Sequence, residues 1–246
     1  RFKNGAISLD QEEVKFVLDK NGTPIKVTKK ERGDSNKLIE EFMLLANKKV
    51  AEVLSPKKKN GKEMQTDSIS LYRIHDLPSK EKMADLAFFL RSLGHKITLQ
   101  DGIIPTYEIN KLLRSLGAKN STKDTVQRAV IRSMAKAIYS TKNIGHYGLA
   151  FEYYTHFTSP IRRYPDVMIH RLLSLYLAKK KIGKERLLEY EKIARVSSDL
   201  EKRASDAERA SIKYKQVEYM SKKLGEKFTG IISGLTEWGI YVEELE

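Results

Sequence analysis

The chain is most informative at residues 155–166, which read Thr155-His156-Phe157-Thr158-Ser159-Pro160-Ile161-Arg162-Arg163-Tyr164-Pro165-Asp166. Ser159 is a good helix N-cap, and Pro160 suits the first helical position, where no backbone N–H is needed. This pattern predicts a helix that starts at Ser159 and carries Arg162 and Arg163 in its first turn. Unpaired N–H groups and the positive end of the helix dipole make such a turn a favourable phosphate site.

Helical spacing beyond this start predicts two faces. Arg162, Asp166 and His170 recur at i, i+4 and i+8 and would share one face. An apolar stripe is expected on another face, formed by Ile161, Met168, Leu172 and Leu175. The alternative interpretation is an ordinary capped amphipathic helix with solvated arginines. Pro165 predicts some irregularity in or just after the first turn.

Composition favours a soluble protein with a polyanionic partner. The 246 residues carry a net charge of +14, with 40% hydrophobic and 32% charged residues and no cysteine. A basic balance of this size is typical of proteins that bind nucleic acid, although a generally lysine-rich protein would share it. The absence of cysteine excludes disulfides and thiolate metal sites. No apolar run reaches membrane-spanning length, and the start shows no signal-peptide pattern.

The remaining pattern predicts an α+β fold. Alternating residues around Asn21-Gly22 predict a hairpin, and a helix is expected to follow from Asp34 or Ser35 to about Leu54, with Leu38, Phe42, Leu45 and Val50 buried. A long helical region from Lys184 to Leu224 has a capping box at Ser198, which predicts a break there. Two β segments with glycines and aromatic residues follow from residue 228.

Several segments together resemble one family. His156 to Asp166, followed by His170-Arg171-Leu172-Leu173, closely resembles the signature of the RNB family of exoribonucleases, which includes ribonuclease II and ribonuclease R. The similarity extends to other segments in the same order: Ile39 to Asn47, Tyr72 to His75, Arg132 to Ala137 and Ala207 to Arg209. The last β segments resemble the opening of an OB-type RNA-binding barrel.

The resemblance implies a fold, a reaction and a partner. The expected fold is α+β, with helices packed on a small, mostly antiparallel sheet and a partial OB-type barrel at the C-terminus. The implied activity is hydrolytic, processive 3′-to-5′ degradation of single-stranded RNA to nucleoside 5′-monophosphates, with Mg²⁺ as cofactor. Arg162 would bind the scissile phosphate and stabilise its developing charge. RNA contacts are expected from Glu40, with Glu41 as its rival, and from Ser159, Arg163, Tyr164 and Glu208. Without the resemblance, each of these glutamates would be interpreted as an ordinary solvated side chain.

The metal half of the implied site is missing from this sequence. In the family the ligands come from an aspartate cluster near the start of the catalytic domain, whereas the aspartates here are isolated, at positions 10, 19, 34, 67, 76, 85 and 101. Some members place a clamping Phe where this chain has Leu9. We therefore expect the Mg²⁺ ligands to lie outside this chain segment, and the 246 residues to be inactive alone.

The domain organisation follows from the same resemblance. Residues 1–224 are expected to be the C-terminal portion of an RNB catalytic domain, and residues 225–246 the first strands of a truncated OB-fold domain. A cytoplasmic monomer is expected. Two alternatives stay open: a non-catalytic RNA-binding relative of the family, and a basic helical protein with some other polyanionic partner, whose salt-dependent binding would ignore Arg162.

Overall fold

The computed structural model describes residues 2–7, 14–29, 32–55, 58–59, 62–63, 69–116, 121–180 and 184–244. The chain divides into two compact units, each built from segments that are separated in sequence. Unit 1 comprises residues 1–7, 31–78 and 135–206. Unit 2 comprises residues 8–30, 79–134 and 207–246.

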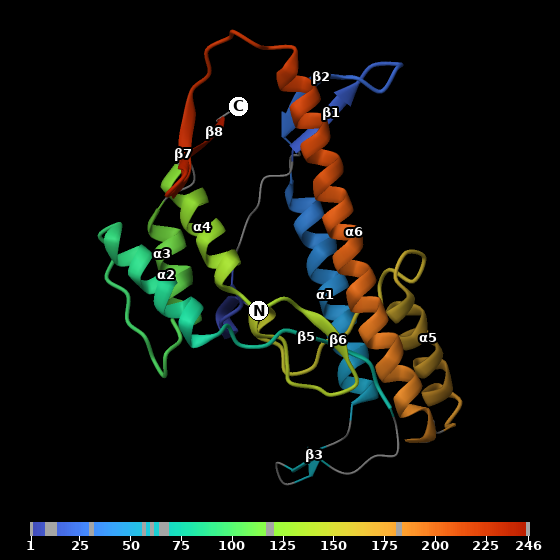
Figure 1. The fold of residues 1–246 in the computed structure, drawn as a ribbon. Helices are drawn as coiled ribbons and strands as arrows, with labels where there is room; N and C mark the ends of the chain where they lie inside the picture. Colours follow the sequence, from blue (N-terminus) through green and yellow to red (C-terminus); the bar gives the residue numbers. More distant parts are fainter. Residues whose placement is uncertain are drawn as a thin grey trace. The chain divides into compact units, whose positions relative to one another are not determined.

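Unit 1 is built around helices α1 (Asp34–Leu54) and α5 (Tyr164–Leu177), which contact each other. Beside the C-terminal half of α1 lies an antiparallel pair of short strands, β5 (Tyr72–Ile74) and β6 (Ile138–Ser140) (Figure 1). Apolar side chains from α1, the segment just before β5, β6, α5 and α6 (Leu187–Ser221) form one core. The buried residues of this core are Leu54, Ile69, Leu71, Tyr139, Met168, Ile169, Leu172, Tyr190 and Ala194. Shorter elements complete the unit: η1 (Phe2–Asn4), β3 (Lys58–Lys59), β4 (Lys62–Glu63), η2 (Tyr147–Leu149) and η3 (Lys184–Arg186).

Helix α1 buries a different face from the predicted one. Its buried residues are Asn47, Ala51 and Leu54, which recur at i, i+4 and i+7 near the C-terminal end. Leu38, Phe42 and Leu45 were expected inside but are 58%, 60% and 49% exposed, so this part of the prediction is wrong. Val50, the fourth residue of that prediction, is partly buried and packs against the core. Apolar side chains occur on both faces of α1, and periodicity alone does not say which face meets the core.

The long helix α6 is unbroken, which contradicts the break predicted at Ser198. The Ser198 hydroxyl donates to the carbonyl of Ala194 at 2.8 Å, one turn earlier in the same helix. The same hydroxyl accepts the backbone N–H of Tyr139 at 2.9 Å. Its hydrogen-bonding capacity is therefore used within α6 and toward β6, instead of capping a new helix start.

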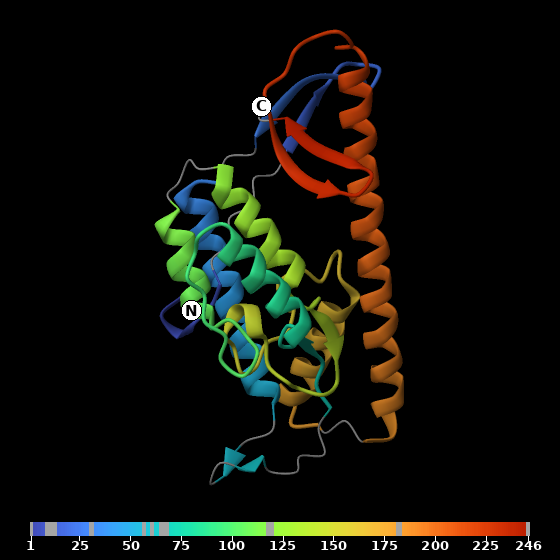
Figure 2. The same ribbon diagram turned by 60° about the vertical axis from the view of Figure 1, so that its left-hand side comes forward.

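Unit 2 contains the predicted hairpin and a group of three helices. Strands β1 (Val14–Leu18) and β2 (Pro24–Lys29) are antiparallel, and the Asp19 side chain accepts the N–H groups of Asn21 and Thr23 at 2.9 Å each. Gly22 has φ +78°, which explains the Asn-Gly turn signal. Helix α4 (Ser121–Ser133) packs against α2 (Lys80–Ser92) and α3 (Thr106–Ser115), and the three lie together in Figures 1 and 2.

The C-terminal β segments form one antiparallel pair, β7 (Gly230–Thr236) and β8 (Gly239–Glu244). Trp238, in the turn between them, is 94% exposed. The predicted α+β class is confirmed, with the antiparallel strands arranged as separate two-stranded pairs. None of the helices in the described part of the chain is long and apolar enough to span a membrane.

Candidate RNA-binding site

Helix α5 begins later than predicted, at Tyr164, with Arg163 at the N-cap position. The expectation that Ser159 caps this helix is wrong. A helix from Pro160 would place Pro165 inside it, where its missing N–H and its ring would disrupt an i to i−4 bond. Starting at Tyr164 leaves Pro165 in the first turn, where no N–H is required. The proline therefore explains where α5 begins.

Residues 155–158 are attached to the core through buried polar groups. The Thr155 hydroxyl donates to the carbonyl of Leu71 at 2.6 Å, and Thr155 is 1% exposed. The Asn47 side-chain oxygen accepts the N–H groups of Phe157 at 2.9 Å and Thr158 at 3.2 Å. The chain thus enters the signature segment in a fixed position.

The buried carboxylate of Asp166 holds the next residues. Asp166 is 0% exposed and accepts the N–H of Ser159 at 2.8 Å. It also receives a two-nitrogen contact from Arg163, from Nε at 2.9 Å and from Nη2 at 2.8 Å. Such paired contacts are strong and directional. Arg163 is therefore largely committed to holding this turn together.

Residues 159–163, named the arginine turn below, present Arg162 to solvent. The backbone N–H groups of Arg162 and Arg163 both donate to the Ser159 carbonyl, at 3.3 and 3.1 Å, which closes the turn. The Arg162 side chain is exposed, and among the described residues it has no hydrogen-bond or ion-pair partner. Ile161 is 102% exposed, so its predicted place in the apolar stripe is wrong. Met168 and Leu172 are buried as expected, at 3% each.

Asp166 and His170 do not share a ligand-binding face with Arg162, because α5 begins after Arg162. His170 Nε2 donates to the Phe157 carbonyl at 2.9 Å, and the rings of His170 and Phe157 stack at 4.1 Å. Both α5 side chains therefore hold the segment that precedes their own helix. Of the three residues predicted on this face, Arg162 alone projects into solvent.

A cluster of aromatic and histidine rings packs around His156 of the signature segment. His156 Nδ1 and the Tyr139 hydroxyl share a hydrogen bond of 2.8 Å, and the Tyr154 ring contacts both His146 and His156 edge-on. Burial, with Arg163 and Arg73 nearby, lowers the pKa of His156 to about 2. Burial, with His75 adjacent, lowers the pKa of His146 to about 3. Both histidines are therefore neutral at physiological pH.

An arginine on β5 connects this cluster to α6. Arg73 makes a two-nitrogen contact with Glu201 of α6, and its guanidinium lies 4.7 Å from the Tyr139 ring centre. Burial is the main reason that the pKa of Tyr139 rises to about 12, so its hydroxyl stays protonated. The cation thus contacts the ring whose hydroxyl bonds His156.

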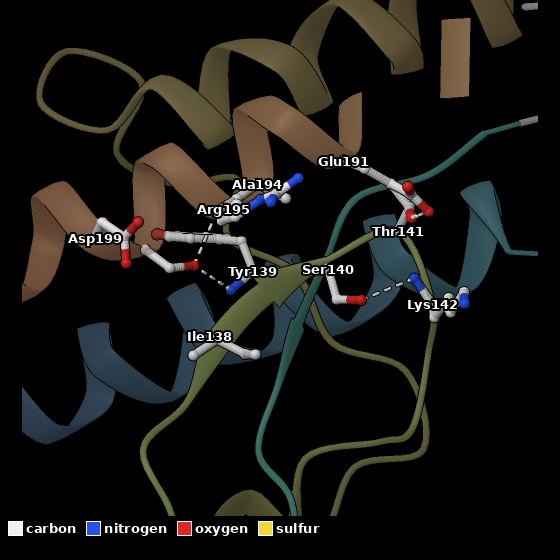
Figure 3. A pocket seen from close by; sticks show the side chains of 10 residues that line it. Ile138, Tyr139, Ser140, Thr141, Lys142, Glu191, Ala194, Arg195 and Asp199 are labelled. Carbon is white, nitrogen blue, oxygen red and sulfur yellow. Dashed lines mark hydrogen bonds between the residues drawn. The ribbon is translucent and has the colours of Figure 1, made fainter. Parts of the chain in front are cut away.

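A pocket of about 370 Å³ lies between β6 with the residues after it and the first half of α6 (Figure 3). Within it, the Ser198 hydroxyl joins the Tyr139 N–H to the Ala194 carbonyl, and Thr141 donates to Glu191 at 3.2 Å. Its charged lining residues are of both signs: Lys142, Arg195, Glu191 and Asp199. This lining contains none of the residues predicted from the sequence to contact RNA.

The predicted glutamates lie in different places. Glu40 is seven residues before Asn47 on α1, which is about 10 Å along the axis and nearly the same helix face. It forms an ion pair with Arg32 at 3.6 Å. Glu41 is one residue on, about 100° around the helix from Glu40. Glu208 is an exposed residue of α6 within unit 2, whereas Arg162 belongs to unit 1.

The described residues do not fit a metal ion. Among them, no group of three or more His, Cys, Asp or Glu side chains is placed to hold one. Of the aspartates named from the sequence, Asp10 and Asp67 lie outside the described residues. Leu9, the position at which an aromatic clamp was in question, lies outside the described residues.

Two positioning residues were missed by sequence reasoning. Asn47 was noted as the end of a family-like segment, and Asp166 as sharing a helix face with Arg162 and His170. A polar residue that recurs with Ala51 and Leu54 at helical spacing was the available signal for Asn47. The i, i+3 spacing of Arg163 and Asp166 was the signal for their ion pair.

The RNB domain family matches residues 1–179. The chain therefore belongs to the RNB family. It is 38% identical to ribonuclease R of Thermotoga maritima over 249 residues, covering 99% of this chain and 34% of that protein. It is 40% identical to ribonuclease R 2 of Lactococcus lactis, covering 98% and 35%. The chain thus spans about one third of the length of the curated relatives it matches.

The fold has a counterpart among solved structures. Mycoplasma genitalium RNase R in complex with ribose methylated single-stranded RNA superposes with a TM-score of 0.85 at 32% identity. The match covers 98% of this chain and 37% of that one. These likenesses confirm the family that the signature segment indicated.

Proposed function

We propose that this chain is the C-terminal catalytic portion of a hydrolytic, processive 3′-to-5′ exoribonuclease that releases nucleoside 5′-monophosphates from single-stranded RNA. The observation that carries the proposal is the exposed Arg162 on an anchored turn. An unpaired guanidinium on a fixed backbone can receive a phosphate without first breaking an ion pair. The net charge of +14 favours attraction of the RNA backbone.

The residues in and beside the arginine turn would have different roles in RNA binding. Arg162 binds the scissile phosphate and stabilises the negative charge that develops there in the transition state. Arg163 has Nε and Nη2 on Asp166 and offers its remaining nitrogen to the RNA backbone. Tyr164, which is 50% exposed, and Ser159 lie beside Arg162 and complete the contact.

Glu40 is the better of the two α1 candidates for an RNA contact. It shares a helix face with Asn47, which bonds directly to the signature segment, whereas Glu41 points about 100° away. Glu208 is proposed as a further RNA contact on the family resemblance alone.

Mg²⁺ is proposed as the cofactor, with ligands outside this chain segment. When bound, it would activate the attacking water and stabilise the leaving oxygen. The described residues of this chain supply the phosphate-binding side, and the 246 residues alone are expected to be inactive. We further propose a cytoplasmic monomer, with the catalytic domain ending near residue 224 and OB-type strands following.

The test is RNA degradation with 5′-labelled single-stranded RNA and Mg²⁺, comparing this chain with a version extended upstream to the length of its relatives. We expect a ladder shortening from the 3′ end with the longer chain only. Arg162→Ala should lower kcat by about 10²- to 10³-fold. Arg171→Ala, which removes an exposed arginine of α5, is the matched control and should change little.

Other outcomes would change the assignment. Degradation by the 246-residue chain would mean that it holds its own metal ligands. Binding without cleavage by both chains would favour the non-catalytic RNA-binding relative. Salt-dependent binding that ignores Arg162→Ala would favour a general polyanion binder.

A further inference from the structure

Asn47 is a buried amide in the middle of α1. It is 3% exposed, and its neighbours along the same helix face, Ala51 and Leu54, are also buried. Burying a polar group without partners is costly, so a buried amide is expected to be fully hydrogen-bonded.

Among the described residues, the hydrogen-bond partners of the Asn47 side chain come from one segment, 107 to 111 residues away in sequence. Its Nδ2 donates to the Tyr154 hydroxyl at 3.2 Å. Its Oδ1 accepts two consecutive backbone N–H groups, from Phe157 at 2.9 Å and Thr158 at 3.2 Å. One oxygen that holds two successive peptide groups fixes both peptide planes.

The arginine turn starts immediately after these two peptide groups. Ser159 is the next residue, and its carbonyl accepts the N–H groups that close the turn around Arg162. Asp166 holds Ser159 from the α5 side at 2.8 Å. The turn is therefore held at two points, by Asn47 of α1 just before it and by Asp166 of α5 at its first residue.

We propose that Asn47 is a positioning residue for Arg162. It does not touch RNA, but it holds the backbone from which the Arg162 guanidinium reaches the scissile phosphate. This inference rests on the proposed function, and it assigns a role to the end of the α1 motif that is separate from the RNA contact proposed for Glu40.

Side-chain chemistry sets the requirement at this position. Aspartate has the same shape and keeps an oxygen for both N–H groups, while alanine leaves both without an acceptor. A guanidinium displaced by about 1 Å can cost on the order of 100-fold in rate, because the transition-state contact depends on geometry.

A double-mutant cycle in the upstream-extended chain tests the role. Asn47→Ala should lower kcat about 10- to 100-fold while KM changes less than about threefold. Added to Arg162→Ala, it should lower kcat by less than about twofold more, since its effect passes through Arg162. Multiplication of the two separate effects in the double mutant would overturn the proposal.

Two matched variants separate positioning from general destabilisation. Tyr154→Phe removes the Nδ2 partner but leaves both backbone contacts, so kcat should stay within about twofold of the parent. Asn47→Asp keeps the acceptor and should recover most of the activity that Asn47→Ala loses. Equal losses in Asn47→Asp and Asn47→Ala would contradict a role through the acceptor oxygen.

A second measurement does not depend on enzyme activity, so the proposal can be tested even if the Asn47→Ala variant folds poorly. In the 246-residue chain, amide hydrogen exchange of Phe157 and Thr158 should be slow, and should speed up at least tenfold in Asn47→Ala. Rapid exchange of these two amides in the parent chain would overturn the proposal. Failure of the proposed function is a different result, because Arg162→Ala would then leave RNA cleavage unchanged.

Discussion

The arginine turn and the first turns of α1 were both interpreted from the sequence as RNA-contacting, yet the fold holds them in opposite ways. The arginine turn rests on buried polar side chains, Asn47 and Asp166, at 3% and 0% exposure. The first turns of α1 expose their apolar residues, including Ile39 and Phe42 at 59% and 60%. The position of a side chain on the arginine turn depends on residues that are distant in sequence, such as Asn47. The position of a side chain on early α1 depends on the helix itself.

This contrast extends to neighbouring residues of the same type. Arg163 is tied to a buried carboxylate, and Arg162 is exposed. Both side chains carry the same charge. In the structure, Arg163 stabilises the turn through Asp166, whereas Arg162 is exposed to solvent and can bind a ligand. Mutations of the buried side chains that hold the arginine turn should therefore have large effects on stability, and mutations in early α1 should have small ones.

The largest effect is expected from Asp166→Ala. It leaves the Ser159 N–H without its acceptor and the Arg163 guanidinium, 18% exposed, without its charge partner. Breaking a buried pair in this way costs about 3–5 kcal/mol. Urea unfolding followed by circular dichroism measures the change.

A matched control exists on a neighbouring element. Arg186 and Glu189 form an ion pair at 3.2 Å with the same i, i+3 spacing, but their side chains are 56% and 54% exposed. Glu189→Ala should change the free energy of unfolding by less than about 1 kcal/mol. Equal losses of unfolding free energy in Asp166→Ala and Glu189→Ala would show that Asp166 stabilises the fold no more than an exposed ion pair does.

Acid should also weaken unit 1. The folded-state pKa values of His146 and His156 lie far below the ordinary 6.5, at about 3 and about 2. The unfolded chain therefore binds more protons as the pH falls below about 6.5, and stability is lost in that direction. Each histidine contributes up to about 1.4 kcal/mol per pH unit in this window.

The measurement is the free energy of unfolding from pH 7 to pH 4 for the parent and His156→Gln. The variant should show a shallower loss of stability with acid, since one depressed group is gone. Identical slopes would mean that His156 is not held neutral in the folded chain.

The smallest effect is expected in early α1. Glu40→Gln should change stability by less than about 1 kcal/mol, because the Arg32 pair is half-exposed. In the extended chain it should weaken RNA binding by about two- to tenfold, which is the value of one hydrogen bond. Glu41→Gln is the control and should leave RNA affinity unchanged. The reverse order would assign the contact to Glu41.

Local signals in the sequence predicted much of the fold. Asn21-Gly22 identified the hairpin, and the signature segment identified the family. The role of Arg162 stays a prediction. Two boundaries were wrong for identifiable reasons: Pro165 delays the start of α5, and the Ser198 hydroxyl bonds within α6 instead of capping a break. The partners of Asn47 are about 110 residues away, and no local pattern reveals a contact over that separation.

The single tryptophan has a practical consequence for every experiment above. Trp238 is the only tryptophan in the chain, is 94% exposed, and belongs to unit 2. Its fluorescence should already resemble that of an indole in water, so unfolding of unit 1 will barely alter it. The same property makes it a natural optical reporter for any partner that covers the β7–β8 turn, with no label to introduce.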